Sequence, residues 1–323
     1  MKLLVYIPCH TDFAEAVLQA TKIRKDFDSY QLKSYPKTVL IEIIISVNSY
    51  LPSHDEKISA EQVCDEVIYN GIGYLADVNI ANGFLLALKK KPDLLWIFSA
   101  NDFLNEGAIA RVLDEFFLDE SIDLLVTNAL DLDLTYQEVE IVNPPKAGFC
   151  YGLITGVIYR LKNIHPYFHN GPFMAWTGWS HLAVIQSAMH SLGGLKVKTV
   201  PWENIYVEGE RDIDNISNYG HSIYGMLILG YSFSNSKKDS KKFIRRTVLN
   251  RFYSWHMYSR NWKYAGQLVS KKNYLGWNQG IAEALIWKSS KLVFGFYLCM
   301  KRLPFRKIRK FQKYTITKIF KKN

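Results

Sequence analysis

Leu40-Ile-Glu-Ile-Ile-Ile-Ser-Val-Asn48 is a run of β-branched and aliphatic residues that ends in polar ones. A short, nearly continuous apolar run of this kind is typical of a parallel strand that is buried on both faces. Ligands of open α/β sheets bind beyond the carboxyl ends of such strands. The polar end of the run, Ser46 to Ser49, is therefore a candidate binding position.

Similar runs and helical patterns alternate on both sides of this stretch. The other predicted strands are Lys2–Ile7, Leu94–Ser99 and Ile122–Thr127. The predicted helices between them are Ala14–Arg24, Asn79–Lys90 and Glu106–Phe117. Further along, Phe149–Arg160 reads as a glycine-interrupted strand and Ser180–Leu192 as a helix. This order predicts an α/β fold with a Rossmann-like, mostly parallel sheet flanked by helices.

Polar residues follow each of the first three long strands. The first strand runs into Pro8-Cys9-His10, the second into Asn48, and the third into Asn101-Asp102, while Asn79 lies at the start of a helix. Because parallel neighbouring strands end at the same edge of a sheet, these groups are expected to converge there. A nucleotide needs amide and carboxylate partners of this kind for its base and ribose.

This ordered set of turns resembles glycosyltransferase family 2, and within it the abequosyltransferase-like branch of surface polysaccharide synthesis. The family has a P-x-H/Y-N-like turn, an S-D-N-S turn, a G…N-x-x-x-G…A helix and a D-x-D turn, in that order. The matching positions here are Pro8 to His10, Ser46 to Ser49, Gly73, Asn79, Gly83, Ala87, and Ala100 to Asp102. The resemblance is strongest over the first third of the chain and extends to about residue 235.

The resemblance implies a GT-A fold and an inverting glycosyltransferase that uses a nucleotide-sugar donor. The implied acceptor is a glycan or a lipid-linked oligosaccharide of a growing surface polysaccharide. The donor-binding residues carried over from the family motifs are Pro8, His10, Asn48, Asn79, Asn101 and Asp102.

A diphosphate leaving group concentrates negative charge as the glycosidic bond breaks, so the site needs a divalent cation or fixed positive groups. Asp102 is the candidate metal ligand and catalytic carboxylate, and the cation would be Mn²⁺ or Mg²⁺. The alternative is that Asp102 caps the helix that follows it. The family pattern is broken at Ala100, Asn101 and Val47, each of which replaces a usual aspartate or D-x-D position, so one carboxylate is left in the turn.

An inverting transferase also needs a general base, and the resemblance points to His181, at the start of the predicted helix Ser180–Leu192. The alternative for His181 is a structural histidine that caps or packs this helix. Trp176 and Trp179 are candidate acceptor-stacking residues or core residues, whereas Trp96, inside a strand, is expected in the core. The reserve candidates for the base are the loop acids Glu208, Glu210 and Asp212.

Charge divides the chain into two unlike parts. Residues 237 to 323 contain 23 Lys and Arg against two acids, although the whole chain carries a formal charge of +10. We therefore predict a GT-A catalytic domain at 1–235 and a helical, basic and aromatic region at 236–323. Cations mixed with tryptophan and tyrosine favour contact with an anionic membrane surface. A helical subdomain that packs its aromatic side chains internally is the alternative.

The N-terminal apolar run is too short for a secretory signal, and four well-separated cysteines suit a reducing compartment. These features predict a cytoplasmic protein, peripheral at the inner face of the cell membrane. Two other functions stay open: a catalytically silent GT-A-like binding protein, and a nucleic-acid-binding protein that uses its basic tail. No nucleic-acid partner is expected, because no recognition motif accompanies the positive charge.

Overall fold

The computed structural model describes residues 1–10, 12–31, 38–48, 50–70, 76–128, 140–142, 154–175, 179–201 and 205–207, together with residues 229 and 232. These residues form an eight-stranded sheet in the order β3-β2-β1-β4-β8-β6-β9-β7 and a two-stranded sheet of β5 and β10. The strands are β1 (Lys2–Cys9), β2 (Leu40–Asn48), β3 (Glu66–Asn70), β4 (Leu94–Ile97), β5 (Phe103–Leu104), β6 (Leu124–Asn128), β7 (Glu140–Val142), β8 (Val157–Arg160), β9 (Leu195–Pro201) and β10 (Tyr206–Val207).

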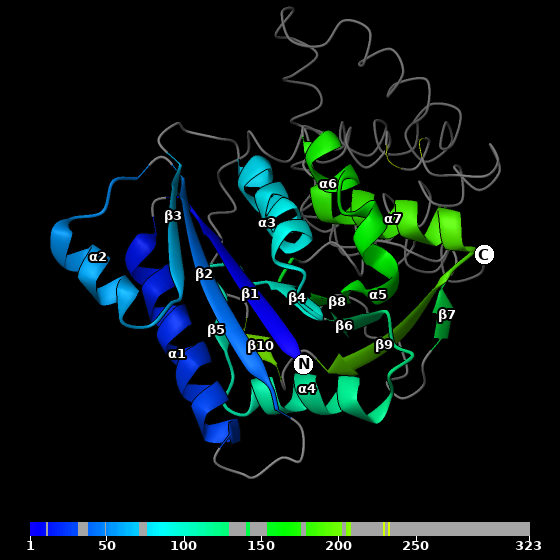
Figure 1. Ribbon diagram of the computed structural model, residues 1–323, viewed down its shortest axis with the longest axis horizontal. Coiled ribbons are helices and arrows are strands. Elements are labelled where there is room, and N and C mark those ends of the chain that lie inside the picture. The colour runs from blue at the N-terminus through cyan, green and yellow to red at the C-terminus, as the bar shows by residue number, and fades with distance from the viewer. Residues whose placement is uncertain are drawn as a thin grey trace, which may run out of the picture.

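The helices lie on both faces of the large sheet (Figure 1). They are α1 (Phe13–Gln31), α2 (His54–Glu61), α3 (Ala76–Lys90), α4 (Ala108–Leu118), α5 (Leu161–Ile164), the 3₁₀ turn η2 (His165–Tyr167), α6 (Asn170–Phe173) and α7 (Ser180–Leu192). In the described part of the chain, no helix combines the length and apolar character that crossing a membrane requires.

Alternation along β1 divides the core into two layers. Leu4 and Tyr6 join a cluster with residues of α3, α5 and α7, whereas Leu3, Val5 and Ile7 join one with residues of α1, α2 and α4. All five side chains are fully buried. Successive strand side chains point to opposite faces, so one continuous apolar strand supplies both layers.

The mostly parallel α/β sheet predicted from the sequence is confirmed. Strand β1 pairs in parallel with β2 and β4, β2 with β3, and β6 with β9. Strand β8 lies between β4 and β6 and is antiparallel to both, and β7 is antiparallel to β9. The segment after β2 contains α2 and β3, two elements that are absent from the predicted order.

Short-range signals account for several helix ends. Helix α2 begins with a capping box, in which the Glu56 backbone N–H donates to Ser53 Oγ at 3.3 Å and the Ser53 N–H donates to Glu56 Oε2 at 2.7 Å. Helix α7 begins at Ser180 and ends at Leu192 as predicted, before Gly193 at φ 77°. The predicted region 236–323 lies outside the described residues.

Candidate functional site

The carboxyl ends of β1 and β2 are tied to α3 by one buried asparagine. The Asn79 Nδ2 group donates to the backbone oxygens of Cys9, at 3.2 Å, and of Ser46, at 2.9 Å. Its Oδ1 accepts hydrogen bonds from the hydroxyls of Ser46, at 2.6 Å, and Tyr6, at 2.9 Å. Asn79 is 2% exposed. Both amide hydrogens and two oxygen lone pairs are thus engaged by protein groups that hold the strand ends together.

The same network reaches β3 and requires a glycine on α3. The Asn70 Nδ2 group donates to Ser46 Oγ at 3.0 Å, and Asn70 stands in register with Asn48 across β3 and β2. A Cβ atom added to Gly83 would lie 2.7 Å from Cδ1 of the Tyr6 ring. Gly83 therefore lets α3 approach β1 closely enough for Tyr6 to reach Asn79.

The turn after β4 holds Asp102 in a second buried network. Thr155 Oγ1 donates to Asp102 Oδ2 at 2.5 Å and accepts the Ser99 backbone N–H at 2.9 Å. The Thr155 backbone oxygen accepts a hydrogen bond from Trp96 Nε1 at 2.8 Å. Asp102 is 1% exposed, so its carboxylate faces the protein. Trp96 is fully buried, which confirms its predicted place in the core.

Asp102 is not the cap of the following helix. Helix α4 has Gly107 at its N-cap, with φ 75° and no side-chain cap of its own. The Asp26 carboxylate, from α1, accepts the backbone N–H groups of Gly107 at 2.6 Å and Ile109 at 2.8 Å instead. The alternative reading of Asp102 as a helix cap is therefore wrong, because a side chain from another helix meets those donors.

Two carboxylates that sequence reasoning overlooked stand beside Asn101. In the amide orientation that satisfies its neighbours, Asn101 Nδ2 donates to Asp12 Oδ2 and to Glu15 Oε2, each at 3.2 Å. Asp12 precedes α1 and Glu15 lies in its first turn. Asn101 and Asp12 are half-buried and Glu15 is exposed, so these groups reach solvent where Asp102 does not. Their only sequence signal was that they follow the first strand closely.

The other residues of the predicted donor set lie along the same edge. Pro8 stands in register with Ser46 and is half-buried, and His10 is exposed directly after β1. Asn48 is fully buried at the end of β2. Burial, together with the nearby Asp12 carboxylate, raises the pKa of the Cys9 thiol to about 12. Cys9 is therefore a thiol at neutral pH and is unsuited to act as a nucleophile.

Residues predicted to act on the acceptor lie at or before the start of α7. His181 is 2% exposed, and its ring centroid lies 5.7 Å from that of Trp179. Trp179 is 7% exposed and belongs to the core cluster shared by α3, α5 and α7. Trp176 lies outside the described residues, as do the loop acids Glu208, Glu210 and Asp212.

Solved structures of similar fold exist for this chain. S. aureus TarS 1-349 in complex with UDP-GlcNAc matches with a TM-score of 0.56 and 12% identity, over 89% of this chain and 81% of that one. A longer TarS structure matches with a TM-score of 0.54 and 11% identity, over 91% of this chain. The chain spans 53% of that longer structure. No protein-family model matches the sequence, and no curated protein does.

The chain has a GT-A-type glycosyltransferase fold. At 11% to 12% identity the likeness establishes the fold and not the reaction. The broader resemblance to GT-A glycosyltransferases is thus confirmed at the level of structure, whereas the abequosyltransferase-like branch is not.

The side chains at this edge suit a divalent cation that binds together with the donor diphosphate better than a cation held by protein ligands alone. Within the described ranges, no three His, Cys, Asp or Glu side chains are grouped to hold a metal ion. Mg²⁺ is commonly bound by one or two carboxylates together with substrate phosphates and water. Asp102 would fit that role if its carboxylate turned from Thr155 toward a diphosphate, since oxygen is the ligand that such cations prefer.

Proposed function

We propose that the chain is a glycosyltransferase that moves a sugar from a nucleotide-sugar donor to a glycan or lipid-linked acceptor. The observation that carries this proposal is the Asn79 network, which brings the ends of β1 and β2 together at the carboxyl edge of a GT-A sheet. Residues after β4 join the same edge, because Asn101 contacts the two acids that follow β1. Open α/β sheets bind nucleotides at such an edge.

The donor would be bound by residues that have different tasks. His10 and Asn101 reach solvent and would contact the donor directly, and Pro8 and Asn48 would shape the pocket for the base. Asn79 has its amide hydrogens engaged by backbone oxygens, so we assign it the task of positioning the strand ends. In this proposal every residue of the predicted donor set keeps its place at the sheet edge, but the residues have different tasks.

Asp102 would bind a Mn²⁺ or Mg²⁺ ion together with the donor diphosphate. The cation would neutralise the charge that develops on the leaving group. Thr155 and Ser99 fix the turn that carries Asp102, so the carboxylate would start from a defined position. To reach the cation, the carboxylate would turn from Thr155 and exchange that hydrogen bond for the metal contact.

His181 would act as the general base for an inverting transfer, with Trp176 and Trp179 beside the acceptor sugar. Support for His181 comes from its position at the start of α7 and its contact with Trp179. Histidine often serves as a general base, because a neutral imidazole has a ring nitrogen that can accept the proton of an acceptor hydroxyl. The basic region 236–323 would hold the enzyme at an anionic membrane surface, at the inner face of the cell membrane, where lipid-linked acceptors occur.

A thermal-shift panel of UDP-, GDP-, CDP- and dTDP-sugars, with and without Mn²⁺, tests the donor assignment. A ligand at 100 times its Kd stabilises the folded state by about 2.7 kcal/mol, which is a readily measured shift in Tm. We expect one nucleotide class to raise the Tm, and Mn²⁺ to increase the shift. If no nucleotide sugar changes the Tm, the proposed function fails.

Asp102→Asn is the variant of choice for the metal role, because asparagine can still accept the Thr155 hydrogen bond. It should remove the Mn²⁺-dependent part of the shift and leave the protein folded. Asp28→Asn, at an exposed position of α1, is the matched control and should behave like the parent. Nucleotide-sugar binding without release of the nucleoside diphosphate, with any acceptor glycan, would indicate the silent GT-A-like binding protein instead.

A further inference from the structure

The segment that joins β4 to α4 runs alongside helix α1. At its beginning, the Asn101 amide donates to the carboxylates of Asp12 and Glu15. A little further along, the Lys22 ammonium lies 4.9 Å from the centroid of the Phe103 ring. Lys22 follows Glu15 by about two helical turns. The segment and the first part of α1 therefore run in the same direction and stay side by side.

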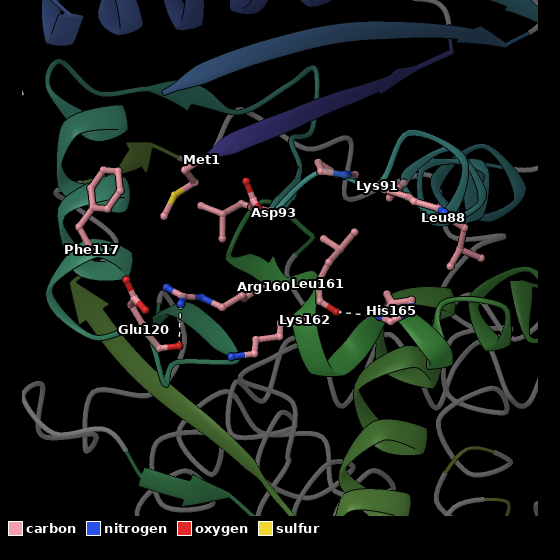
Figure 2. A pocket seen from close by; sticks show the side chains of 13 residues that line it. Met1, Leu88, Lys91, Asp93, Phe117, Glu120, Arg160, Leu161, Lys162 and His165 are labelled. Atoms are coloured by element: carbon pink, nitrogen blue, oxygen red, sulfur yellow. Dashed lines mark hydrogen bonds between the residues drawn. The ribbon is translucent and has the colours of Figure 1, made fainter. Parts of the chain in front are cut away.

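Helix α4, which follows this segment, is held at both of its ends. The Asp26 carboxylate accepts two backbone N–H groups at its start. At its other end, Arg160 donates to the backbone oxygens of Phe116 and Glu120, each at 2.6 Å. Figure 2 shows the contact with Glu120 beside a cleft of about 670 Å³ at the start of β1 and β4. Because β4 is itself paired with β1 and β8, the segment that carries Asp102 is anchored at both ends.

Gln19 lies on the face of α1 that is turned to this segment. Asp12, Gln19 and Asp26 are spaced about two helical turns apart, so their side chains share one face of the helix. The first and the last of the three contact the segment near its two ends. Because side chains of a helix lean toward its N-terminus, the Gln19 carboxamide is directed toward the turn that carries Asn101 and Asp102.

The carboxamide of Gln19 is buried without a hydrogen bond. Gln19 is 0% exposed, and among the described residues neither its Nε2 nor its Oε1 has a partner. Its neighbours on the helix, Ala16, Ala20 and Ile23, belong to the apolar core. Removal of an amide from water without replacement of its hydrogen bonds costs free energy. The amide therefore destabilises the free protein, and its hydrogen bonds can be recovered only in a second state of the segment beside it.

We propose that Gln19 is a positioning residue of the donor site, an inference that rests on the proposed function. When the nucleotide sugar and its cation draw Asp102 away from Thr155, the turn shifts between its anchored ends. The Gln19 carboxamide then forms hydrogen bonds to backbone groups of the turn. These bonds exist only in the donor-bound form, so they favour that form over the free one. Gln19 does not touch the donor and acts through the turn that holds the cation.

Gln19→Met tests this role, because methionine has the length of glutamine without its polar groups. The Tm of the free full chain should rise by a few degrees, since an amide without a partner leaves the core. The Kd of the nucleotide sugar that most stabilises the parent, titrated calorimetrically with Mn²⁺ present, should rise by about tenfold, which is the effect of one hydrogen bond. A glutamine with a structural role alone would lower the Tm on substitution and leave this Kd unchanged.

Gln62→Met is the matched control, because Gln62 is exposed at the end of α2. Its Tm and its Kd for the same nucleotide sugar should equal those of the parent. A second measurement places Gln19→Met in the Asp102→Asn background. There it should not weaken binding further, because both changes act on the same turn and their effects are not additive. An additional tenfold loss in that background would contradict the role, since Gln19 would then act independently of Asp102.

Failure of this role and failure of the proposed function give different results. If the parent binds a nucleotide sugar with Mn²⁺ and Gln19→Met binds it equally well, the role of Gln19 is wrong and the proposed function stands. If no nucleotide sugar changes the Tm of the parent, the proposed function fails and the role of Gln19 fails with it. A lower Tm of free Gln19→Met would also overturn the role, because the amide would then have a partner in the free protein.

Discussion

The Ser46 hydroxyl donates a 2.6 Å hydrogen bond to Oδ1 of Asn79 in the interior of the protein. These residues lie 33 positions apart, at the end of β2 and near the start of α3. The bond is one of several through which a single amide joins three elements. Because each of these polar groups is buried, loss of the amide leaves several donors and acceptors without partners.

Asn79→Ala should therefore lower the free energy of unfolding by about 2 to 4 kcal/mol. The backbone oxygens of Cys9 and Ser46 would lose their donor, and the hydroxyls of Tyr6 and Ser46 their acceptor. Urea denaturation at neutral pH measures the change. Asn163→Ala is the control, since Asn163 is exposed and makes one hydrogen bond to Asp123, and it should cost less than about 1 kcal/mol. Similar losses in both variants would argue against the Asn79 network.

Gly83→Ala should also destabilise the protein, by about 1 to 3 kcal/mol, although alanine is the better helix former. The added Cβ would lie 2.7 Å from the Tyr6 ring, which is fully buried and held by its hydroxyl to Asn79. Thermal unfolding measures the effect. Leu85→Ala, at an exposed position of the same helix, should change the Tm little. A stabilised Gly83→Ala protein would mean that α3 can move away from β1.

The sequence predicted β1, β2, β4 and β6 well because each is a nearly unbroken apolar run. It missed the parallel strands β3 and β9, in which polar residues interrupt the apolar ones. It did not predict the direction of β8. Val157, Ile158 and Tyr159 are all buried, so no alternation marks a strand that lies antiparallel between β4 and β6. Direction there depends on the connections of the chain, which periodicity does not report.

The candidate site was predictable in its location more than in its contacts. Polar residues at strand ends were expected to meet at one edge because parallel strands end together, and the contacts of Asn79 and Asn101 bring several of them together there. The pairing of Asp102 with Thr155 joins positions 53 apart in the chain, and the position of Asp12 and Glu15 beside Asn101 depends on the start of α1. Such contacts follow from packing between elements, for which a single sequence carries no periodic signal.

A pH-dependent contribution to stability is expected from Glu42. Burial opposes the charged form of this carboxyl, but hydrogen bonds and charge from Lys2 and Lys90 outweigh it and hold its pKa below the usual value. A carboxyl with a lowered pKa in the folded state stabilises the protein above its unfolded pKa of about 4.3. That stabilisation is lost as the pH falls through the lower, folded-state pKa.

Glu42→Gln should consequently cost about 1 kcal/mol at pH 7, and the cost should shrink as the pH falls below about 4. Urea denaturation of parent and variant between pH 3 and pH 7, on the order of five points, measures this difference. Glu61→Gln is the control and should show no such trend, because Glu61 is exposed on α2 and forms no ion pair within the described part of the chain. A cost for Glu42→Gln that grows toward acid would contradict the assigned sign.

Asp26→Ala tests how the start of α4 is held beside α1. The Asp26 carboxylate accepts two backbone N–H groups of α4, and an acid at the positive end of a helix gains further from the helix dipole. We expect a loss of about 1 to 2 kcal/mol in urea denaturation, because Gly107 offers no side chain in its place. Asp28→Ala, two positions along α1 and exposed, should change stability by less than about 0.5 kcal/mol. Since α4 follows the turn that carries Asp102, Asp26→Ala should also weaken any Mn²⁺-dependent nucleotide-sugar shift, whereas Asp28→Ala should leave it intact.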